Sequence, residues 1–282
     1  MVEEILIVGM TMGGLYALIA AGLTLIFGVA NIFNMAHGSF YMLSAYFTLF
    51  LLDYFDVLIS TIFGIILTIV VGVITYILTI RPHQASATRV LLITFGLSIF
   101  FEQAILNIAG VYFQSLPSLI GGSIIVFGVT LVIQRLIILL VSVIVISFLW
   151  IFTVRTKAGK ALRATAQNRE ASMLMGINCD RIFLMAIMLS AFLAATAGVL
   201  ISPLKSLSPY MDAPPLTKAF AISTFGGLGS IKGSTVAAFI ISFVEVIVGY
   251  NFSSYMKELV PLVVIVITIL VRPSGLFGRP MR

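Results

Sequence analysis

Long, continuous apolar runs are the feature that most constrains what this chain can fold into. The longer runs have about 17 to 25 residues, the length of α-helix that crosses a bilayer, and short polar loops separate them. The 282 residues are 61% hydrophobic and 9% charged, whereas globular chains carry roughly 25% charged residues. Strands of a membrane barrel would instead alternate apolar and polar residues. The sequence therefore predicts an all-α integral membrane protein.

The apolar segments predict a bundle of about eight or nine transmembrane helices with broken or re-entrant segments. The segments are 5–30, 40–52, 57–80, 90–109, 136–152, 182–201, 217–230, 236–249 and 259–271. The count is eight if the glycine-rich segment 217–230 is re-entrant. No loop is long enough to form a soluble domain, so we expect a single transmembrane domain over residues 1–282.

A basic polar segment, residues 155–181, interrupts the apolar runs and holds six of the 16 Lys and Arg residues. Positive charge keeps a loop on the cytoplasmic side of a membrane, and the connector 81–89 and the C-terminal RPSGLFGRPMR are basic as well. Alternating the spans from these loops predicts a multi-pass protein of the cell membrane, with the N-terminus outside and the C-terminus cytoplasmic. Anionic lipid headgroups, rather than nucleic acid, then explain the net charge of +6.

The basic segment also predicts a short helix at the cytoplasmic face. Its Ala, Leu, Met, Gln, Arg and Lys residues favour helix. Gly176 and the two residues after it are typical of a helix stop. Such a helix can dock into a groove of a soluble partner. The alternative is a surface helix that only caps the bundle, because a charged face is usually just solvated.

Two interruptions of the apolar pattern are candidates for a solute route. Their residues are Asn34, His37, Gly38, Gly226, Gly227 and Gly229. Irregular backbone at membrane depth is tolerated only where protein or a water-filled cavity surrounds it. The alternative for the first interruption is a tight cytoplasmic turn with a helix N-cap at Asn34 or Ser39. A lone histidine such as His37 is also commonly neutral and merely hydrogen-bonded.

Two carboxylates, Glu102 and Glu245, lie within apolar segments. Because a charge is costly in hydrocarbon, we expect each to face the bundle interior or a wet cavity, with the outer surface as a further alternative for Glu102. One Cys and two His residues provide no disulfide framework and no metal site. The chain also has no phosphate-binding loop for ATP hydrolysis. Two function classes remain: a permease energised through a docked partner, and a stand-alone ion-coupled carrier of a small polar solute.

Three stretches carry a family resemblance: GLTLIFGVANIFNMAHGSFYMLSAY (22–46), GKALRATAQNREASMLMGINCDRIFLMAIMLSAFLAATAGVL (159–200) and KAFAISTFGGLGSIKGSTVAAFIISFVE (218–245). The ending RPSGLFG also fits. The sequence resembles the permease subunits of ABC-type importers for branched-chain amino acids, the LivH type. That family belongs to a wider group that includes LivM-type and ribose-type permeases.

The resemblance implies a transport subunit and not an enzyme. The implied partners are a paralogous permease of the LivM type, two ABC ATPase subunits and an extracytoplasmic amino-acid-binding protein. The chain itself would bind no cofactor, since ATP and Mg are used by the ATPase subunits. The segment 159–176 would be the coupling helix in the ATPase groove, through Arg163, Ala164, Asn168, Ala171 and Gly176. Amides, urea or another small solute, and pairing with a second copy, stay open.

Overall fold

The computed structural model describes residues 2–84, 86–126, 129–253 and 255–278. Helices account for most of this part of the chain. They are α1 (Val2–Ala30), α2 (His37–Leu51), α3 (Val57–Thr75), the π-helical turn η1 (Tyr76–Ile80), the 3₁₀ turn η2 (Arg81–His83), α4 (Ala87–Ala109), α5 (Ile133–Arg155), α6 (Lys157–Gln167), α7 (Arg169–Leu174), α8 (Cys179–Ile201), α9 (Ala213–Gly226), α10 (Ile231–Asn251) and α11 (Met256–Val271). The strands β1 (Ser123–Val126) and β2 (Val129–Val132) pair antiparallel.

Each of the nine predicted apolar segments contains a helix, so the predicted all-α membrane bundle is confirmed. Within the described residues, six helices are long and apolar enough to cross a membrane: α1, α3 with its two terminal turns, α4, α5, α8 and α10. The helices α2, α9 and α11 have only 15, 14 and 16 residues. At a rise of about 1.5 Å per residue each is shorter than the ~30 Å hydrocarbon core.

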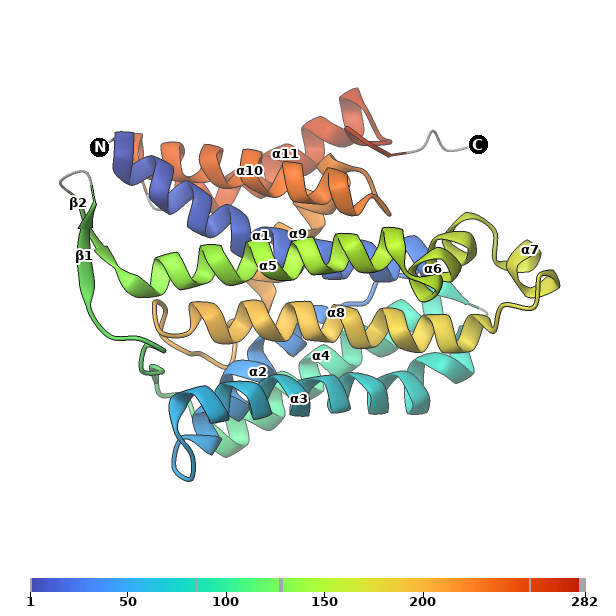
Figure 1. Ribbon diagram of the computed structural model, residues 1–282, viewed down its shortest axis with the longest axis horizontal. Helices are drawn as coiled ribbons and strands as arrows, with labels where there is room; N and C mark the ends of the chain where they lie inside the picture. The colour runs from blue at the N-terminus through green and yellow to red at the C-terminus, as the bar shows by residue number, and fades with distance from the viewer. Residues whose placement is uncertain (1, 85, 127–128, 254, 279–282) are drawn as a thin grey trace.

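The β1–β2 ribbon is the feature of the fold that the apolar pattern did not predict. Both strands are rich in β-branched residues, SIIV and VTLV, and this composition favours a pleated backbone. The ribbon lies at one end of the bundle beside the N-terminus, whereas α6, α7 and the segment 272–278 lie toward the opposite end (Figure 1). We call these the ribbon end and the platform end, and α6 with α7 the platform.

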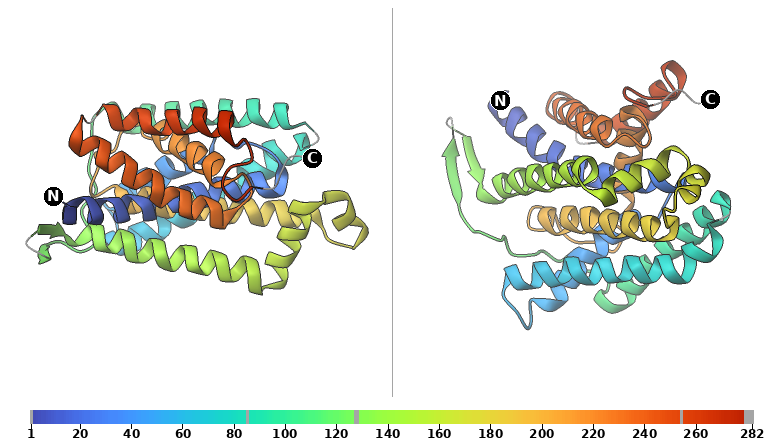
Figure 2. Two further views of the ribbon diagram at one scale, coloured as in Figure 1. Left: turned by 90° about the horizontal axis from the view of Figure 1, so that it is seen from above. Right: turned by 45° about the vertical axis from the view of Figure 1, so that its right-hand side comes forward.

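Helix α1 is the buried centre of the bundle and packs against α5, α8, α9 and α10. Its glycines let α10 approach closely, as the G-x-x-x-G spacing indicates. A Cβ atom on Gly9 would lie 2.5 Å from Cδ1 of Phe243, and one on Gly13 would lie 2.5 Å from Cδ1 of Phe239. Figure 2 shows α1 and α10 side by side from a second direction.

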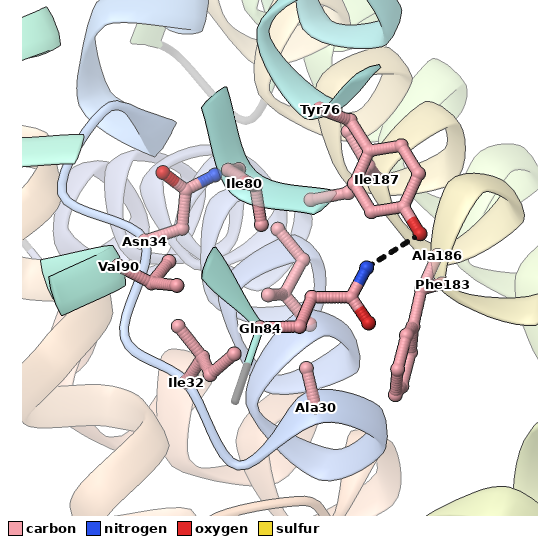
Figure 3. Close-up of a pocket in the computed structure, with 11 residues that line it drawn as sticks. Ala30, Ile32, Asn34, Tyr76, Ile80, Gln84, Val90, Phe183, Ala186 and Ile187 are labelled. Atoms are coloured by element: carbon pink, nitrogen blue, oxygen red, sulfur yellow. Dashed lines mark hydrogen bonds between the residues drawn. The ribbon is translucent and has the colours of Figure 1, made fainter. Parts of the chain in front are cut away.

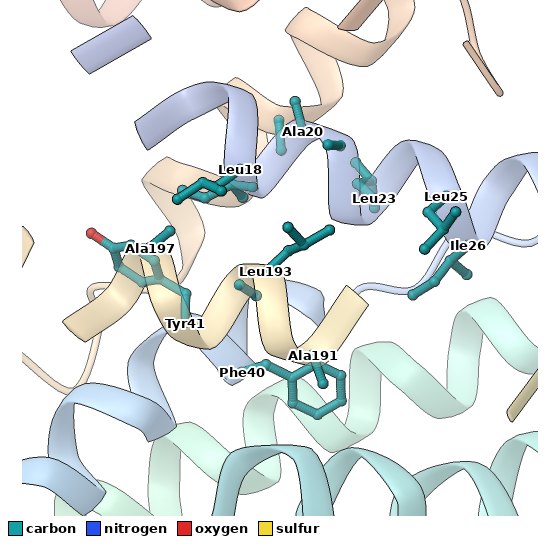
Figure 4. Close-up of a cluster of buried hydrophobic side chains, with 14 of the residues drawn as sticks. Leu18, Ala20, Leu23, Leu25, Ile26, Phe40, Tyr41, Ala191, Leu193 and Ala197 are labelled. Carbon is teal, nitrogen blue, oxygen red and sulfur yellow. The ribbon is translucent and has the colours of Figure 1, made fainter. Parts of the chain in front are cut away.

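The apolar core forms where α1, α2 and α8 meet (Figure 4). Leu18, Leu23, Phe40, Ala191 and Leu193 are almost completely buried there. The outer helices differ, because most side chains of α3, α4 and α5 are at least partly exposed and apolar. Those three helices therefore present the surface that meets lipid or another membrane subunit.

Candidate functional site

The two short helices α2 and α9 begin inside the bundle, next to each other. Nε2 of His37, the first residue of α2, lies 2.9 Å from the carbonyl oxygen of Ile19, close to the midpoint of α1. A Cβ atom on Gly38 would lie 2.7 Å from the carbonyl oxygen of Asp212, the residue directly before α9. The N-termini of two half-length helices therefore meet at membrane depth. We call His37, Gly38, Ser39, Ser98 and Asp212 the central junction.

Residues 31–36 lead from the platform end back to this junction. Asn31 adopts a left-handed conformation with φ of 51°, a region that Asn tolerates better than most residues. The side chain of Asn34 is buried, and its Oδ1 accepts from the backbone N of Ala36 at 3.1 Å. The backbone N of Met35 donates to Oγ1 of Thr94. Side chains thus replace the hydrogen bonds that a helix would have supplied.

These contacts correct one alternative from the sequence. An N-cap at Asn34 or Ser39 is wrong, because Ala36 is the cap residue of α2 and no side chain caps this helix. Asn34, His37 and Ser39 are all buried, so these three residues lie within the protein and not in an exposed turn. The chain enters the bundle before α2 begins, and buried protein surroundings make this irregular backbone tolerable.

Helix α9 begins in a similar way after the proline-rich loop. Pro214 and Pro215 lie in its first turn, where a missing backbone N–H carries no cost. The preceding loop is tied to the loop between α4 and β1 by a bridge between Leu207 and Gln114. Residues 202–212 therefore run from the ribbon end to the central junction, and α9 continues to the platform end.

The His37 side chain joins α2 to two other helices, α1 and α8, through hydrogen bonds. A carbonyl oxygen only accepts, so Nε2 of His37 donates to Ile19 in α1, and a neutral ring then accepts from Oγ of Ser190 in α8 at 2.9 Å through Nδ1. Gly22 makes room for the ring, because a Cβ there would lie 2.7 Å from Cε1 of His37. Both ring nitrogens are therefore engaged within the protein.

Asp212 connects the two half-length helices with α4. Its Oδ2 accepts from Oγ of Ser39 at 3.2 Å and from Oγ of Ser98 at 3.1 Å. Ser98 is partly exposed, and Ala213 and Pro214 are exposed, so the junction reaches the surface between α4 and α9. Asp212 was not among the predicted site residues, because it lies in the loop 202–215. The Asp-Ala-Pro-Pro order, an acidic residue followed by helix-starting prolines, is the signal that marks it.

The predicted glycine interruption lies elsewhere, at the platform end of α9. Gly227 and Gly229 have φ of 103° and 85°, which a side chain would strain. The segment 272–278 docks there, because the backbone N of Leu276 donates to the carbonyl of Phe225 at 2.8 Å and that of Phe277 to Gly226 at 3.0 Å. The structure thus places these glycines at the opposite end of α9 from Gly38, which lies beside Asp212.

The platform consists of two short helices where the sequence predicted one. Asn168 is extended, with φ of −158°, and its Oδ1 accepts from the backbone N of Ala171 at 2.9 Å, so it ends α6 and begins α7. Gly176 follows α7 with φ of 79°, which agrees with the predicted stop. Arg163, Asn168, Ala171 and Gly176 are exposed, and Ala164 is partly buried.

Large apolar side chains protrude from the platform. Leu174 is 90% exposed, Met175 83% and Met173 49%. They lie among the basic residues of the segment 155–181, beyond the helices of the bundle (Figure 1). An exposed apolar cluster with a polar rim is typical of a protein-docking surface.

A hydrogen-bonded chain links the platform to the end of α3. Nη2 of Arg169 donates to Oε1 of Gln84 at 3.2 Å, and Nε2 of Gln84 donates to the hydroxyl of Tyr76 at 2.9 Å. The Tyr76 hydroxyl donates in turn to the carbonyl of Asp180 at 3.1 Å. Figure 3 shows Gln84 and Tyr76 lining a small, mostly apolar pocket that Asn34 also lines. The hydrogen-bonded chain therefore passes beside Asn34, one of the residues that lead into α2.

The two carboxylates of the apolar segments lie in different surroundings. Glu245 is buried in α10, and its Oε2 lies 3.1 Å from Nζ of Lys218 in α9. The hydroxyl of Tyr16 donates to the same oxygen at 2.7 Å. Glu102 is partly exposed on α4, one turn from Ser98. Lys218 was not predicted as a site residue, because its apolar and aromatic neighbours in the sequence give no sign of a buried cation.

Broken helices that meet at membrane depth, together with a platform at one end, define a class of protein: a polytopic solute permease. Residues 5–269 match the profile of the family described as "Branched-chain amino acid transport system / permease component". The chain belongs to this family.

Individual relatives agree with this membership. The chain is 30% identical over 289 residues to the high-affinity branched-chain amino acid transport system permease protein LivH of Escherichia coli, covering 96% of this chain and 94% of that one. It is 29% identical over 292 residues to BraD of Pseudomonas aeruginosa, covering 98% and 95%. The fold is similar to PsaBC from Streptococcus pneumoniae in complex with Fab, with a TM-score of 0.55, 14% identity and 97% of both chains covered.

Proposed function

We propose that this chain is the membrane-spanning permease subunit of an ABC importer that translocates branched-chain amino acids delivered by an external binding protein. The similarity to LivH over 96% of the chain is the observation that carries the proposal. The buried junction of α2 and α9 supports it, because interrupted helices at membrane depth are where transporters build solute routes.

The platform is the proposed docking site for the ATPase subunits. The sequence has no phosphate-binding loop of its own, so the energy comes from a partner. Two ABC ATPase subunits would use ATP and Mg, and this chain would hold neither. The exposed Leu174 and Met175 supply the apolar contact, and exposed Arg163 and Arg169 supply positive charge around it.

The proposed orientation places the platform end in the cytoplasm and the N-terminus outside. Basic residues support it, because they concentrate at that end of the bundle. There they are Arg81, Arg89, Arg155, Lys157, Lys160, Arg163, Arg169, Arg181, Lys232 and Arg272, against Arg135, Lys205, Lys218 and Lys257 toward the ribbon end. Arg279 and Arg282 of the basic C-terminus lie outside the described residues.

The surface between α4 and α9 is the proposed contact with a second permease, a paralogue of the LivM type. Polar side chains support this assignment, since Ser98, Glu102 and Gln103 are partly or fully exposed on α4. Polar groups at membrane depth need a protein or water partner. In this arrangement the central junction forms one side of the solute route, and the second permease forms the other side.

A co-purification experiment tests the docking assignment. Arg163→Glu combined with Leu174→Asp reverses a charge and removes an apolar contact at the exposed platform, so ATPase recovered with the permease should fall at least tenfold. Arg135→Glu, at the ribbon end, is the matched control and should leave recovery unchanged. Equal recovery from both variants would contradict the assignment of the platform.

Proteoliposomes test the energy source and the solute. With all subunits present, ATP should drive accumulation of leucine, isoleucine and valine, and amides and urea serve as the competing solutes. The stand-alone carrier makes the opposite prediction, because the purified chain would accumulate solute under a proton or sodium gradient without nucleotide. Gradient-driven uptake by the chain alone would therefore overturn the proposal.

A further inference from the structure

A charged cavity lies toward the ribbon end, between α1, α9, α10 and α11. It is separate from the central junction, with which it shares no residue. Five charged side chains line it: Lys205, Lys218, Glu245, Lys257 and Glu258. Three ammonium groups and two carboxylates in one cavity are unusual for a chain in which only 9% of residues are charged.

The base of the cavity is a buried ion pair with an unused acceptor. Nζ of Lys218 lies 3.1 Å from Oε2 of Glu245 and 2.9 Å from the hydroxyl of Tyr16, which donates to that same Oε2. Oε1 of Glu245 is buried and has no partner within the described residues. An unsatisfied carboxylate oxygen in a low-dielectric site is costly, and a ligand with N–H donors would satisfy it.

The mouth of the cavity has a net positive charge, because two lysines and one carboxylate, the exposed Glu258, line it. Lys205 and Lys257 both line it, and Lys205 is exposed. Partial burial of its ammonium lowers the pKa of Lys205, and the positive charge of Lys218 lowers this pKa further. An incoming anionic group would relieve this repulsion. The cavity therefore offers a free carboxylate oxygen at its base, beside the Lys218 ammonium, and an excess of cations over carboxylates at its mouth.

The remaining walls are apolar. Val8 and Met12 of α1 and Val246 of α10 line the cavity, and Gly249 leaves room beside them. An aliphatic side chain would bury its surface against these groups, which stabilises binding by about 25 cal/mol per Å². Ligand pockets commonly combine such walls with a few convergent polar groups.

We propose that this cavity binds a zwitterionic α-amino acid with an aliphatic side chain. The ligand's ammonium would donate to Oε1 of Glu245, and its carboxylate would face Lys205 and Lys257. The inference rests on the proposed function, because the ribbon end is then the outer side at which a binding protein delivers its solute. The cavity is thus a receiving site: it binds the solute that the binding protein delivers, on the outer side of the central junction.

A phospholipid headgroup with an ammonium and a phosphate has the same charge pattern, so the test must separate the two sources. The assembled importer is placed in nanodiscs of phosphatidylglycerol, with Met12→Cys as the reporter and Cys179→Ser removing the native thiol. A methanethiosulfonate reagent then labels the introduced thiol at the cavity wall, and the labelling rate is measured with and without ligand.

Leucine should slow this labelling at least threefold and saturably. Two analogues each lack one charge: 3-methylbutylamine has no carboxylate and 4-methylpentanoate has no ammonium, so neither should protect at the same concentration. Nanodiscs that contain phosphatidylethanolamine provide the lipid arm. Protection by that lipid and none by leucine would overturn the proposal in favour of a headgroup site.

Substitutions of the lysines at the cavity mouth provide a second measurement, the leucine concentration that gives half-maximal protection. Lys257→Met and Lys205→Met should each raise the leucine concentration for half-protection about tenfold, whereas Lys232→Met at the platform end should not change it. The ATPase subunits that co-purify with the permease are quantified in the same samples. Their absence would count against the proposed importer, and it is distinguishable from a failure of leucine to protect the thiol. Unchanged labelling at a leucine concentration that saturates uptake would contradict the receiving site.

Discussion

Nη2 of Arg169 lies 3.2 Å from Oε1 of Gln84, and this contact joins α7 to the residue that follows η2. The guanidinium of Arg169 also lies over the ring of Phe183 in α8, 4.7 Å from its centroid. The π-helical turn η1, just before η2, is an irregularity of the kind that often accompanies function. A movement of the platform would therefore reach both α3 and α8.

The first prediction concerns this link. Arg169→Met and Gln84→Leu should each lower the number of leucine molecules transported per ATP hydrolysed by about threefold or more, because the platform stays but its connection to η1 is lost. Uptake and ATP hydrolysis are measured together in proteoliposomes. Arg181→Met, an exposed neighbour, is the control and should keep the wild-type ratio; an equal ratio in all three variants would exclude the link.

The second prediction concerns His37. His37→Ala should lower the thermal midpoint in detergent by several degrees, because it leaves the Ser190 hydroxyl and the Ile19 carbonyl without their buried partner at a cost of about 1–3 kcal/mol each. The ring's volume is lost as well. Unfolding is followed by intrinsic fluorescence.

His83→Ala is the matched control for His37. His83 is only partly buried and its ring makes one hydrogen bond within the described residues, to the carbonyl of Thr79, so its removal should change the midpoint little. If the two variants melted at the same temperature, His37 would not be the fastening that joins α1, α2 and α8.

The third prediction concerns the ion pair of Lys218 and Glu245. Lys218→Met should destabilise the protein by about 3–5 kcal/mol, because it leaves a buried carboxylate without its cation. The double variant Lys218→Met with Glu245→Leu should recover part of that loss, since no unpaired charge remains. The comparison uses thermal midpoints in one detergent, and a double variant that is no better than the single one would contradict the pairing.

The bundle follows from local features of the sequence. Apolar length, polar separators and positive loops are properties of short segments, so each of the nine predicted segments proved to contain a helix. Asn34, His37 and Gly38 stand out for the same reason, because polar residues between two apolar segments are visible without knowing the fold.

The contacts that build the central junction are of another kind. Ser39 and Asp212 are 173 residues apart, and no local pattern pairs them. It is α9 that meets α2 there, and α10, the next helix along the chain, begins at the platform end. Lys218 was missed because its significance depends on Glu245 being packed against it.

The last prediction concerns Asp212. An Asp before a helix usually caps it, but this side chain makes no cap hydrogen bond and accepts instead from Ser39 and Ser98. Asp212→Ala should therefore leave α9 intact and remove the acceptor that joins it to α2 and α4. We expect leucine uptake to fall at least tenfold while the recovery of ATPase subunits stays unchanged.

Asp212→Asn provides the graded control, because its amide keeps one acceptor oxygen at the same place while removing the charge. Uptake by Asp212→Asn that lies between the wild type and Asp212→Ala would show that the hydrogen bonds and the charge both contribute. Uptake at the wild-type level in Asp212→Ala would show that the central junction is not part of the solute route, whatever the fold of α2 and α9.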